Sequence, residues 1–437
     1  MTYDTDEDNN STKLDIRCLE DDDAGGHWKR FFEKGLGALL ADKYFLLLYV
    51  PKDGAKMRII QPASDPYHRQ QMIKRVNEAS HIPSFYYALS HLWGITKDNP
   101  QLWEEIGDYV DDMDGQPASP VPMRPDKRAT LLALLRAHPD SYWWIDVLCA
   151  RTDTPLDIMG DIYSCCLECI AMIDCEPILL SKFDTDRNMR EEIVDYYMIR
   201  NPSTEDVMRY KRLHAKYPQL KDQVCQLRQS EWWKRVWTWQ EMALPYGDVR
   251  LIAETDDGHF QTNTTTMDEL INSFKNVFEI LVYLAVADDT EEPKYNNSFV
   301  DKNFDFMLEI YHARTFNKHR IGKKSPSSFA FLIGTLGASD RRCMDPVDYV
   351  YGVLGMFQFK IPRMNDPTAV WQRFVAELEK YIEDMRGGRF EIADDKYQIT
   401  AFNDRAYQID LREAENMSDV YHEMDFCEKY DSDSNSE

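Results

Sequence analysis

Two acidic residues, Asp146 and Glu241, lie inside apolar, tryptophan-rich segments of the chain. Asp146 belongs to the run WWIDVLC (143–149), and Glu241 ends the run EWWKRVWTWQE (231–241), which holds four of the ten tryptophans. A carboxylate surrounded by indole rings loses water, which raises its pKa and suits it to acid–base work or to stabilising a cation. Two structural roles also fit: Glu241 at the rim of an aromatic core, and Asp146 capping the backbone amides of a loop.

The spacing around Glu241 is also that of a helix, in which side chains three or four positions apart share a face. Trp233, Trp237 and Gln240 would form one stripe of such a helix, and Glu241 would share the face of Trp237. Arg235 would lie on another stripe. The segment therefore predicts a carboxylate, an arginine and several indoles close together.

A third segment, SFYYALSHLWG (84–94), carries Ser90, Trp93 and Gly94 where a predicted strand passes into a loop. Polar residues at the C-terminal ends of parallel strands commonly face the crevice in which α/β proteins bind ligands. We therefore predict that Ser90–Trp93, Asp146 and Glu241 converge on one cleft.

Familiar catalytic and metal-binding motifs are absent from the sequence: it contains no phosphate-binding glycine loop, no HExxH and no GxSxG. Cys165, Cys166, Cys169 and Cys175 cluster along the chain, but adjacent helical residues diverge by about 100° and cannot all face one ion. We expect buried thiols there and no metal site.

The order of the apolar segments predicts an α/β fold. Short apolar runs at 45–50, 84–94, 141–149, 168–174 and 248–255 predict strands, with helices expected at 127–139 and 156–166 and a loop over 111–125. This alternation is typical of a parallel sheet covered by helices. Helical spacing then follows at Met267–Ala287, Phe299–Thr315, Ser325–Leu336, Pro346–Phe357 and Ala369–Met385, and residues 390–411 alternate like a small hairpin sheet.

We accordingly divide the chain into five segments. They are an acidic N-terminal segment (1–40), an α/β domain (41–255), a helical region (256–388), a small β-rich segment (389–418) and an acidic disordered tail (419–437). The predicted class is α/β, with a parallel-sheet N-terminal unit and a mainly helical C-terminal part.

Composition narrows the class of protein. The formal net charge of −25 argues against nucleic acid and anionic membranes as partners, because both require basic surfaces. No apolar stretch is long enough to span a bilayer, and the N-terminus lacks the pattern of a secretion signal. Nine cysteines without a disulfide-type spacing fit reduced thiols. We expect a soluble cytoplasmic protein.

Four segments, in order, resemble the heterokaryon incompatibility (HET) domain of filamentous fungi. They are YYALSHLWG (86–94), WWIDVLC (143–149) with MGDIYSCC (159–166), RVWTWQE (235–241) and DPVDYVYGVLGM (345–356). The resemblance extends over about 45–357. Ala150, Arg151 and Thr152 replace the Ile-Asn-Gln usual after the central cysteine, Pro155 stands where a glutamine is usual, and His91 replaces a tyrosine.

The resemblance implies a role in nonself recognition and programmed cell death after fusion of unlike cells, through self-association or other protein partners. HET domains are also distantly similar to TIR domains, some of which cleave the nicotinamide–ribose bond of NAD. This implies a Rossmann/TIR-like sheet, with NAD as a substrate and no established cofactor.

By the same analogy Glu241 would stabilise an oxocarbenium-like ribosyl centre, with Asp146 as a second catalytic candidate. The ligand-binding candidates are Ser90, Trp93, Gly94, Arg235 and Trp237; an indole would stack on a ring of the ligand and Arg235 would meet pyrophosphate. Three hypotheses follow: incompatibility through protein association, an NAD glycohydrolase dependent on Glu241, and an acidic regulatory protein that keeps the fold without a toxic output.

Overall fold

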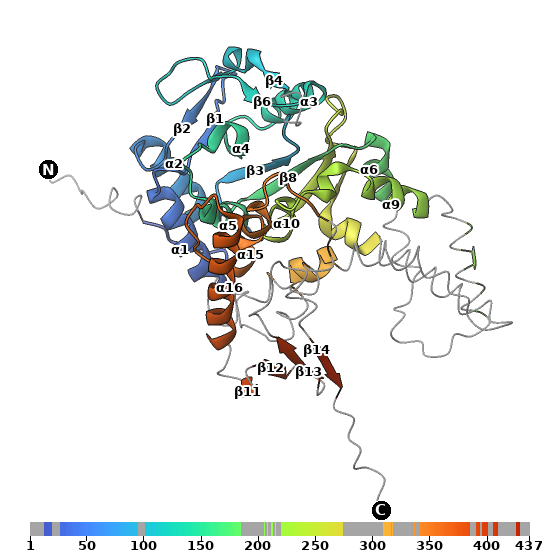
Figure 1. Cartoon of the computed structure of the whole chain (residues 1–437). Coiled ribbons are helices and arrows are strands. Elements are labelled where there is room, and N and C mark those ends of the chain that lie inside the picture. The colour runs from blue at the N-terminus through green and yellow to red at the C-terminus, as the bar shows by residue number, and fades with distance from the viewer. Residues whose placement is uncertain are drawn as a thin grey trace, which may run out of the picture.

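An eight-stranded sheet forms the centre of the molecule (Figure 1). The computed structural model describes residues 13–19, 27–94, 101–184, 220–273, 309–315 and 341–384, four C-terminal strands, and single residues between 205 and 339. The sheet has the order β10-β9-β8-β3-β7-β1-β2-β5. Its strands are β1 (Leu47–Val50), β2 (Met57–Ile60), β3 (Tyr86–His91), β5 (Val110–Asp111), β7 (Ser141–Ile145), β8 (Glu168–Ile173), β9 (Val249–Ala253) and β10 (Thr264–Thr266).

The four central strands, β7, β3, β8 and β9, run parallel, and antiparallel pairs flank them at β1 and β10. Every residue of β7 is buried, and so are the last four of β3. Strands covered on both faces consist of nearly continuous apolar residues, which is the pattern that predicted them. The predicted α/β class, with a largely parallel N-terminal sheet and helices towards the C-terminus, is confirmed.

Helices cover both faces of this sheet. The helices among the described residues are α1 (His27–Ala41), α2 (Pro66–Asn77), α3 (Pro125–Arg136), α4 (Asp146–Cys149), α5 (Met159–Ser164), α6 (Pro177–Asp184), α9 (Leu220–Arg228), α10 (Thr238–Ala243), α14 (Asp348–Tyr351), α15 (Leu354–Phe357) and α16 (Pro367–Asp384), with short 3₁₀ helices η1 (Glu104–Asp108), η2 (Leu156–Ile158) and η4 (Glu231–Lys234). A two-residue ladder joins β4 (Leu102–Trp103) and β6 (Val121–Pro122).

Neighbouring residues of β3 show which helices lie on which face. The Tyr86 hydroxyl donates to the carbonyl of Ile162 in α5 at 2.6 Å, whereas the Tyr87 ring contacts His138, just after α3. Side chains alternate along a strand, so one face of β3 belongs to α5 and the other to α3. Figure 1 shows α5, α10 and α15 together on one side of β3 and β8, with α3 on the other.

The chain reverses its direction across the sheet at β3. From β3 it passes over the α3 face to β7, and from β7 it returns over the α5 face to β8, on the other side of β3. In open α/β sheets, ligands bind beyond the carboxyl ends of the strands that flank such a reversal. The topology therefore predicts a ligand-binding site beyond the carboxyl ends of β3 and β8.

One hydrophobic core joins segments from Ile16 to Tyr381. Helix α1 buries four large side chains in it, and the ring of Trp28 lies 4.2 Å from that of Tyr246. At the other end, Phe374 of α16 packs against Phe357. This core includes residues on both sides of the boundaries predicted at 40–41 and 255–256.

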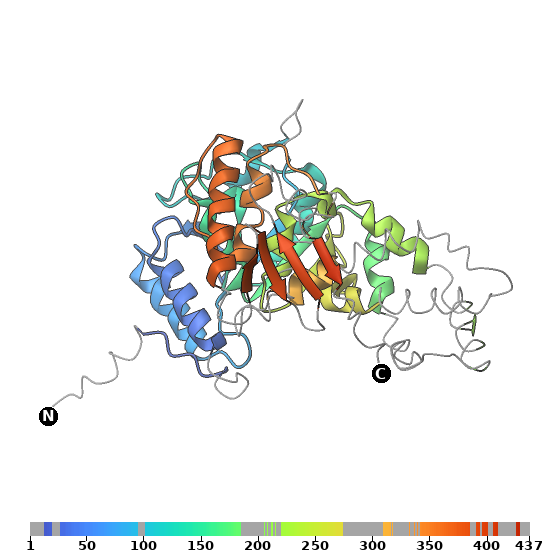
Figure 2. The same cartoon turned by 60° about the horizontal axis from the view of Figure 1, so that its bottom comes forward.

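A second, four-stranded antiparallel sheet comprises β11 (Phe390–Ala393), β12 (Lys396–Thr400), β13 (Arg405–Ile409) and β14 (Asp425–Glu428) (Figure 2). Its first three strands lie where alternation predicts a hairpin sheet. Strand β14 lies inside 419–437, the segment whose composition predicts a disordered tail. Its backbone pairs with β13, an interaction between distant residues that composition does not register.

The prediction of one helix over 231–241 is wrong. Helix η4 ends at Lys234, Arg235 is extended (φ −87°, ψ 136°), and α10 begins only at Thr238. The cause is a backbone bridge in which Val236 donates to the Arg342 carbonyl at 3.2 Å and Arg342 donates to the Lys234 carbonyl at 2.7 Å. The predicted tryptophan stripe therefore does not form.

Two further element predictions change in the structure. Asp146 was expected inside a strand, but β7 ends at Ile145 and Asp146 begins α4. The helix predicted over 346–357 is two short helices, α14 and α15. Parts of the helices predicted at 267–287, 299–315 and 325–336, and most of both acidic termini, lie outside the described residues. Among the described residues, no helix is both long and apolar enough to cross a bilayer.

Helices α5 and α15 meet at two glycines. A Cβ added to Gly160 would lie 2.6 Å from the Gly355 Cα, and one added to Gly355 would lie 2.6 Å from the Gln240 side chain. Real Cβ atoms do not approach other atoms so closely, so both positions require glycine. The contact brings α15, from the C-terminal part, against α5 and α10.

We predict that Gly160→Ala destabilises the protein by about 1–3 kcal/mol, because the two helix backbones must separate to admit a methyl group. Urea unfolding measures the change. Gly258→Ala is the matched control, since a Cβ there meets nothing within 4 Å; it should alter stability by less than about 0.5 kcal/mol. Equal effects of the two variants would contradict the close contact.

Candidate active site

On the α5 face, a buried hydrogen-bonded chain ends at Glu241. The Trp232 indole N–H donates to Ser90 Oγ at 2.8 Å, and Ser90 Oγ donates to Glu241 Oε2. Ser90 and Glu241 are 1% and 4% exposed. Ser90, near the end of strand β3, and helix α10, which carries Glu241, thus hold this carboxyl group away from water.

Asp174, directly after β8, positions this chain. Its carboxylate accepts hydrogen bonds from the Ser230 hydroxyl and from the backbone N–H groups of Glu231 (3.0 Å) and Trp232 (3.1 Å). A carboxylate at a helix start satisfies donors that otherwise have no partner. The end of β8 therefore fixes η4, which in turn aims Trp232 at Ser90.

Burial raises the pKa of Glu241 to about 7, against the lowering influence of the Arg235 charge and the Ser90 hydrogen bond. The Asp146 charge raises this pKa and the Arg341 charge lowers it, each by less than the Arg235 charge does. A carboxyl group with this pKa is a mixture of acid and base near neutrality. It can accept or release a proton without a large change in free energy.

On the α3 face, a second network surrounds Asp146; it is buried except for Trp93, which is 38% exposed. His91 Nε2 lies 2.9 Å from Asp146 Oδ1, His91 Nδ1 lies 2.7 Å from Lys127 Nζ, and the Trp93 indole donates to Asp146 Oδ2. A charged Lys127 can only donate, so Nδ1 then accepts and the imidazole is neutral with its proton on Nε2; this nitrogen lies beside Asp146 without an aligned hydrogen bond to it. This arrangement links a buried lysine to a buried aspartate through one neutral ring.

Burial, then the neighbouring Lys127, lowers the pKa of His91, and burial lowers the pKa of Lys127 to about 7. Burial alone would raise the pKa of Asp146, but His91, the Trp93 donor and the Arg235 charge together hold it below its usual range. Asp146 is therefore an ionised carboxylate at neutral pH, whereas Glu241 is partly protonated.

Arg235 lies between the two networks. Its Nη1 donates to the His91 carbonyl at 2.8 Å, and its charge lowers the pKa of both Glu241 and Asp146. Two carboxyl groups whose surroundings move their pKa values apart are the usual basis of paired acid and base roles. Glu241 and Asp146, at the end of β3, are such a pair, since the pKa of the first is raised and that of the second is lowered.

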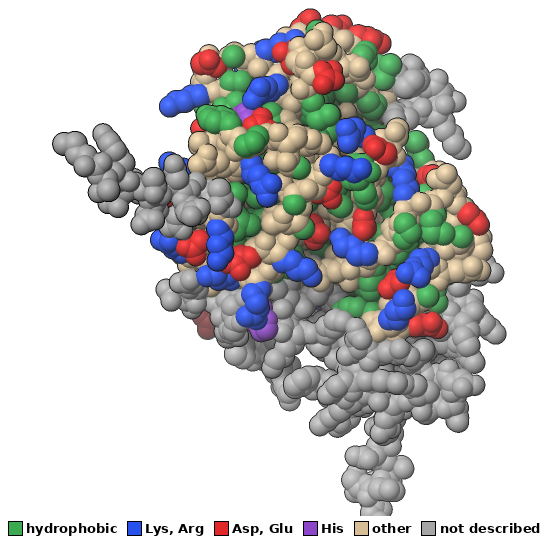
Figure 3. All heavy atoms as spheres, turned by 90° about the vertical axis from the view of Figure 1, so that its left-hand side faces the viewer, with side chains coloured by type: hydrophobic (Ala, Val, Ile, Leu, Met, Phe, Trp, Pro, Cys, Tyr) green, Lys and Arg blue, Asp and Glu red, His purple; other side chains and the backbone are tan. Residues whose placement is uncertain are grey.

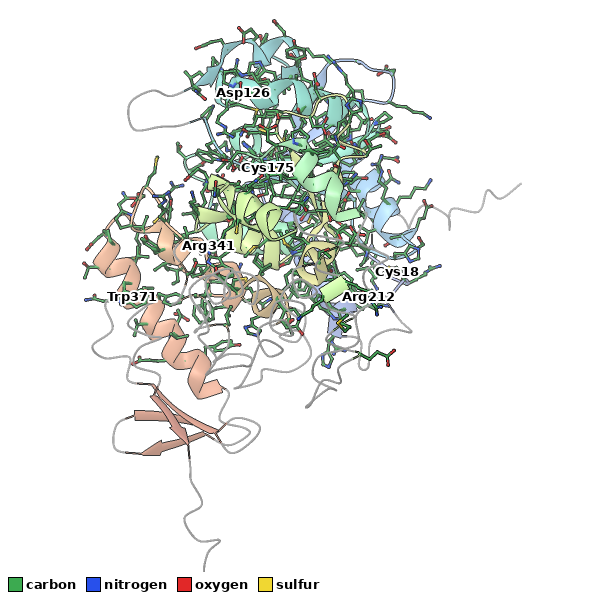
Figure 4. The ribbon with its side chains drawn as sticks, turned by 90° about the vertical axis from the view of Figure 1, so that its right-hand side faces the viewer. Cys18, Asp126, Cys175, Arg212, Arg341 and Trp371 are labelled. Carbon is green, nitrogen blue, oxygen red and sulfur yellow. The ribbon has the colours of Figure 1, made fainter. Side chains whose placement is uncertain are left out.

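The structure brings Ser90, Trp93, Asp146, Arg235 and Glu241 to the end of β3, but not to one face of it. Ser90 and Glu241 are on the α5 face, whereas Trp93 and Asp146 join His91 on the α3 face. In Figure 4, Asp126 at the start of α3, Cys175 after β8, and Arg341 lie in that order from the top of the view downward. Strand alternation separates the groups, a consequence the sequence analysis did not draw.

Gly94 and Trp237, the other two predicted ligand-binding residues, make contacts that serve the fold. A Cβ on Gly94 would lie 2.5 Å from the Gln101 carbonyl oxygen and 2.7 Å from the Met123 nitrogen, so glycine here permits a close backbone approach. Trp237 is half-buried and hydrogen-bonds Asp348 at the start of α14.

The sequence patterns did not indicate Lys127, Trp232 or Arg341 as site residues, and His91 entered the prediction only as part of the stretch Ser90–Trp93. Arg341 reaches back to the start of α10, where it donates to the Arg235 carbonyl at 3.1 Å and to the Thr238 hydroxyl. A lysine in the first turn of a helix, or an arginine a hundred residues downstream, carries no local signal of such contacts.

The cysteines near β8 are core residues. Cys165, Cys166 and Cys169 are buried, and burial raises the pKa of each thiol. They therefore remain protonated and unreactive at neutral pH. Among the described residues, no group of three or more His, Cys, Asp or Glu side chains is arranged to hold a metal ion.

Residues 86–241 match the family model described as "Heterokaryon incompatibility protein (HET)". The chain contains a HET domain. The match begins at the first residue of β3 and ends on Glu241, so it includes both networks and Arg235. Neither the comparison with curated proteins nor that with solved structures found a match.

We predict that Glu241 makes stability fall as pH rises from about 4.5 to 7. Its carboxyl ionises near 4.5 when unfolded and near 7 when folded, so the folded state holds the extra proton in this window. The stabilisation present below pH 4.5 is lost by pH 8, about 3 kcal/mol in all.

Urea unfolding at pH 4.5 and 8 tests this, with Glu241→Gln expected to lack that loss. Glu105→Gln, at a largely exposed carboxylate, should follow the wild type. Parallel pH curves for wild type and Glu241→Gln would refute the assignment.

Proposed function

We propose that this protein acts in heterokaryon incompatibility, in nonself recognition that leads to programmed cell death when unlike fungal cells fuse. The observation that carries the proposal is the HET domain, whose matched range holds the two buried networks at the end of β3. Ionisable groups are costly to bury, so a fold that keeps so many of them in its core has a use for them.

We further propose that it acts in the cytoplasm with protein partners or with a second copy. Figure 3 shows acidic, basic and apolar side chains interspersed on the face that lies at the left in Figure 1. Side chains of all three kinds are available on this face for contacts with another protein, and the net charge of −25 disfavours nucleic acid as the partner.

A second candidate activity, cleavage of NAD to nicotinamide and ADP-ribose, is favoured by the opposed pKa shifts of Glu241 and Asp146. In this proposal the bond from ribose to the nicotinamide nitrogen breaks, and nicotinamide leaves with the electron pair. The ionised form of Glu241 stabilises the cationic ribosyl centre. Water then adds to that carbon, and Glu241 accepts the proton that the water releases.

The buried state of Glu241 sets a condition on this activity. The Ser90 hydroxyl occupies Oε2, and Glu241 is nearly inaccessible, so the substrate must open the end of β3 and replace that hydrogen bond. Arg235 is suited to bind the pyrophosphate. Its Nη1 donates to a neutral carbonyl, which fixes the guanidinium group without neutralising its charge.

For the incompatibility role, we predict that expression in a filamentous fungus arrests growth and that Trp237→Ala relieves the arrest. Truncating this indole removes its bond to Asp348 and costs about 3 kcal/mol of stability. Colony extension is the measurement, with protein level followed in parallel. Glu105→Gln should arrest growth like the wild type. Normal growth with abundant wild-type protein would instead support the regulatory hypothesis.

For the enzymatic candidate, we predict that the purified protein releases nicotinamide from NAD and that Glu241→Gln lowers the rate at least about a hundredfold. The amide keeps the shape of the side chain but cannot become an anion or take a proton. Nicotinamide is measured by chromatography, with Glu105→Gln as control. No release by the wild type excludes the enzyme; growth arrest that persists in Glu241→Gln favours association.

A further inference from the structure

The hydroxyl of Tyr163 is a buried polar group without a hydrogen-bond partner among the described residues. Tyr163 lies in α5, is 1% exposed, and packs its ring edge-on against Trp144 with 5.4 Å between centroids. Buried hydroxyls nearly always have a partner, because leaving one unpaired costs free energy. The unpaired Tyr163 hydroxyl is therefore an exception that needs a physical reason.

The Tyr163 hydroxyl lies on the helix that packs against the helix of Glu241. Helix α5 packs against α10, which carries Glu241. Trp144, the ring that Tyr163 contacts, lies two residues before Asp146. After burial, the charges of Glu241 and then Asp146 are the largest influences that raise the pKa of Tyr163. The hydroxyl thus lies within the field of both carboxylates, yet neither accepts its proton.

The neighbouring groups define the ligand that suits this position. Asp146 and ionised Glu241 only accept hydrogen bonds, whereas the Tyr163 hydroxyl has a proton to donate. A phosphate would accept from the tyrosine but would be repelled by ionised Glu241, and a carbonyl compound has no proton to donate to that carboxylate. A sugar hydroxyl can accept a hydrogen bond from the tyrosine while it donates one to a carboxylate, and so it suits both the donor and the acceptor.

We propose that Tyr163 is a substrate-binding residue whose hydroxyl donates a hydrogen bond to a ribosyl oxygen of the ligand held by Glu241. This inference rests on the proposed cleavage of NAD and adds a specific contact to it. The ribose then has a donor on α5 and an acceptor on α10, which would fix its orientation as the bond to nicotinamide breaks.

Tyr163→Phe removes only the hydroxyl and keeps the ring in place. Its matched control is Tyr86→Phe, on the same face of the sheet: that tyrosine is 0% exposed, but its hydroxyl is paired with the Ile162 carbonyl at 2.6 Å. Two measurements are made on each full-length protein. They are the melting temperature and the dissociation constant for ADP-ribose, a product that carries the ribose and is not turned over.

We expect Tyr163→Phe to melt at or above the wild-type temperature and to bind ADP-ribose about tenfold more weakly. Tyr86→Phe should melt lower, because it leaves a buried carbonyl unpaired, and should bind normally. A lower melting temperature for Tyr163→Phe, or unchanged binding, overturns the inference. Wild type that binds ADP-ribose but does not cleave NAD refutes the enzyme alone; wild type that binds none refutes both.

Discussion

The burial of Glu241 against Ser90 is the constraint around which the centre of this protein is built. A carboxyl group removed from water is tolerated only with compensating hydrogen bonds and charges, and here these come from distant parts of the chain. Ser90 is the penultimate residue of β3, Trp232 is held by Asp174 just after β8, and Arg235 donates to the carbonyl of His91, the last residue of β3. Because each partner depends on another, the group forms one cooperative unit.

Strand β3 divides this polar interior. Ser90 and His91 are adjacent in sequence, so their side chains point to opposite faces of the sheet. The α5 face favours a carboxyl with a raised pKa, and the α3 face an ionised carboxylate beside a neutral imidazole. Arg235 contacts the backbone between them and acts on both charges. Two protonation environments therefore lie one residue apart, coupled by a single guanidinium group.

The matched range 86–241 does not contain every residue that holds the candidate site. Arg341, beyond the matched range, ties down the start of α10 and lies over the Trp239 ring with 4.5 Å to its centroid. Gly355 brings α15 against Gly160, and α1 contributes four core side chains before the domain begins. The stability of the site should thus depend on segments on both sides of residues 86–241.

The sequence by itself determined the α/β class and most strands of the parallel core, and it singled out several residues that the structure places at the end of β3. It could do so because buried parallel strands consist of short apolar runs, and because carboxylates among tryptophans are rare enough to be noticed. Both signals are local.

Tertiary structure decided the rest. The helix predicted around Arg235 is broken by a bridge to Arg342, and Asp146 belongs to a helix start rather than to a strand. Lys127 becomes a buried partner of His91 only because α3 packs over β3. Each of these depends on contacts between residues far apart in the chain. Local spacing carries no information about such contacts, since they exist only once the sheet has formed.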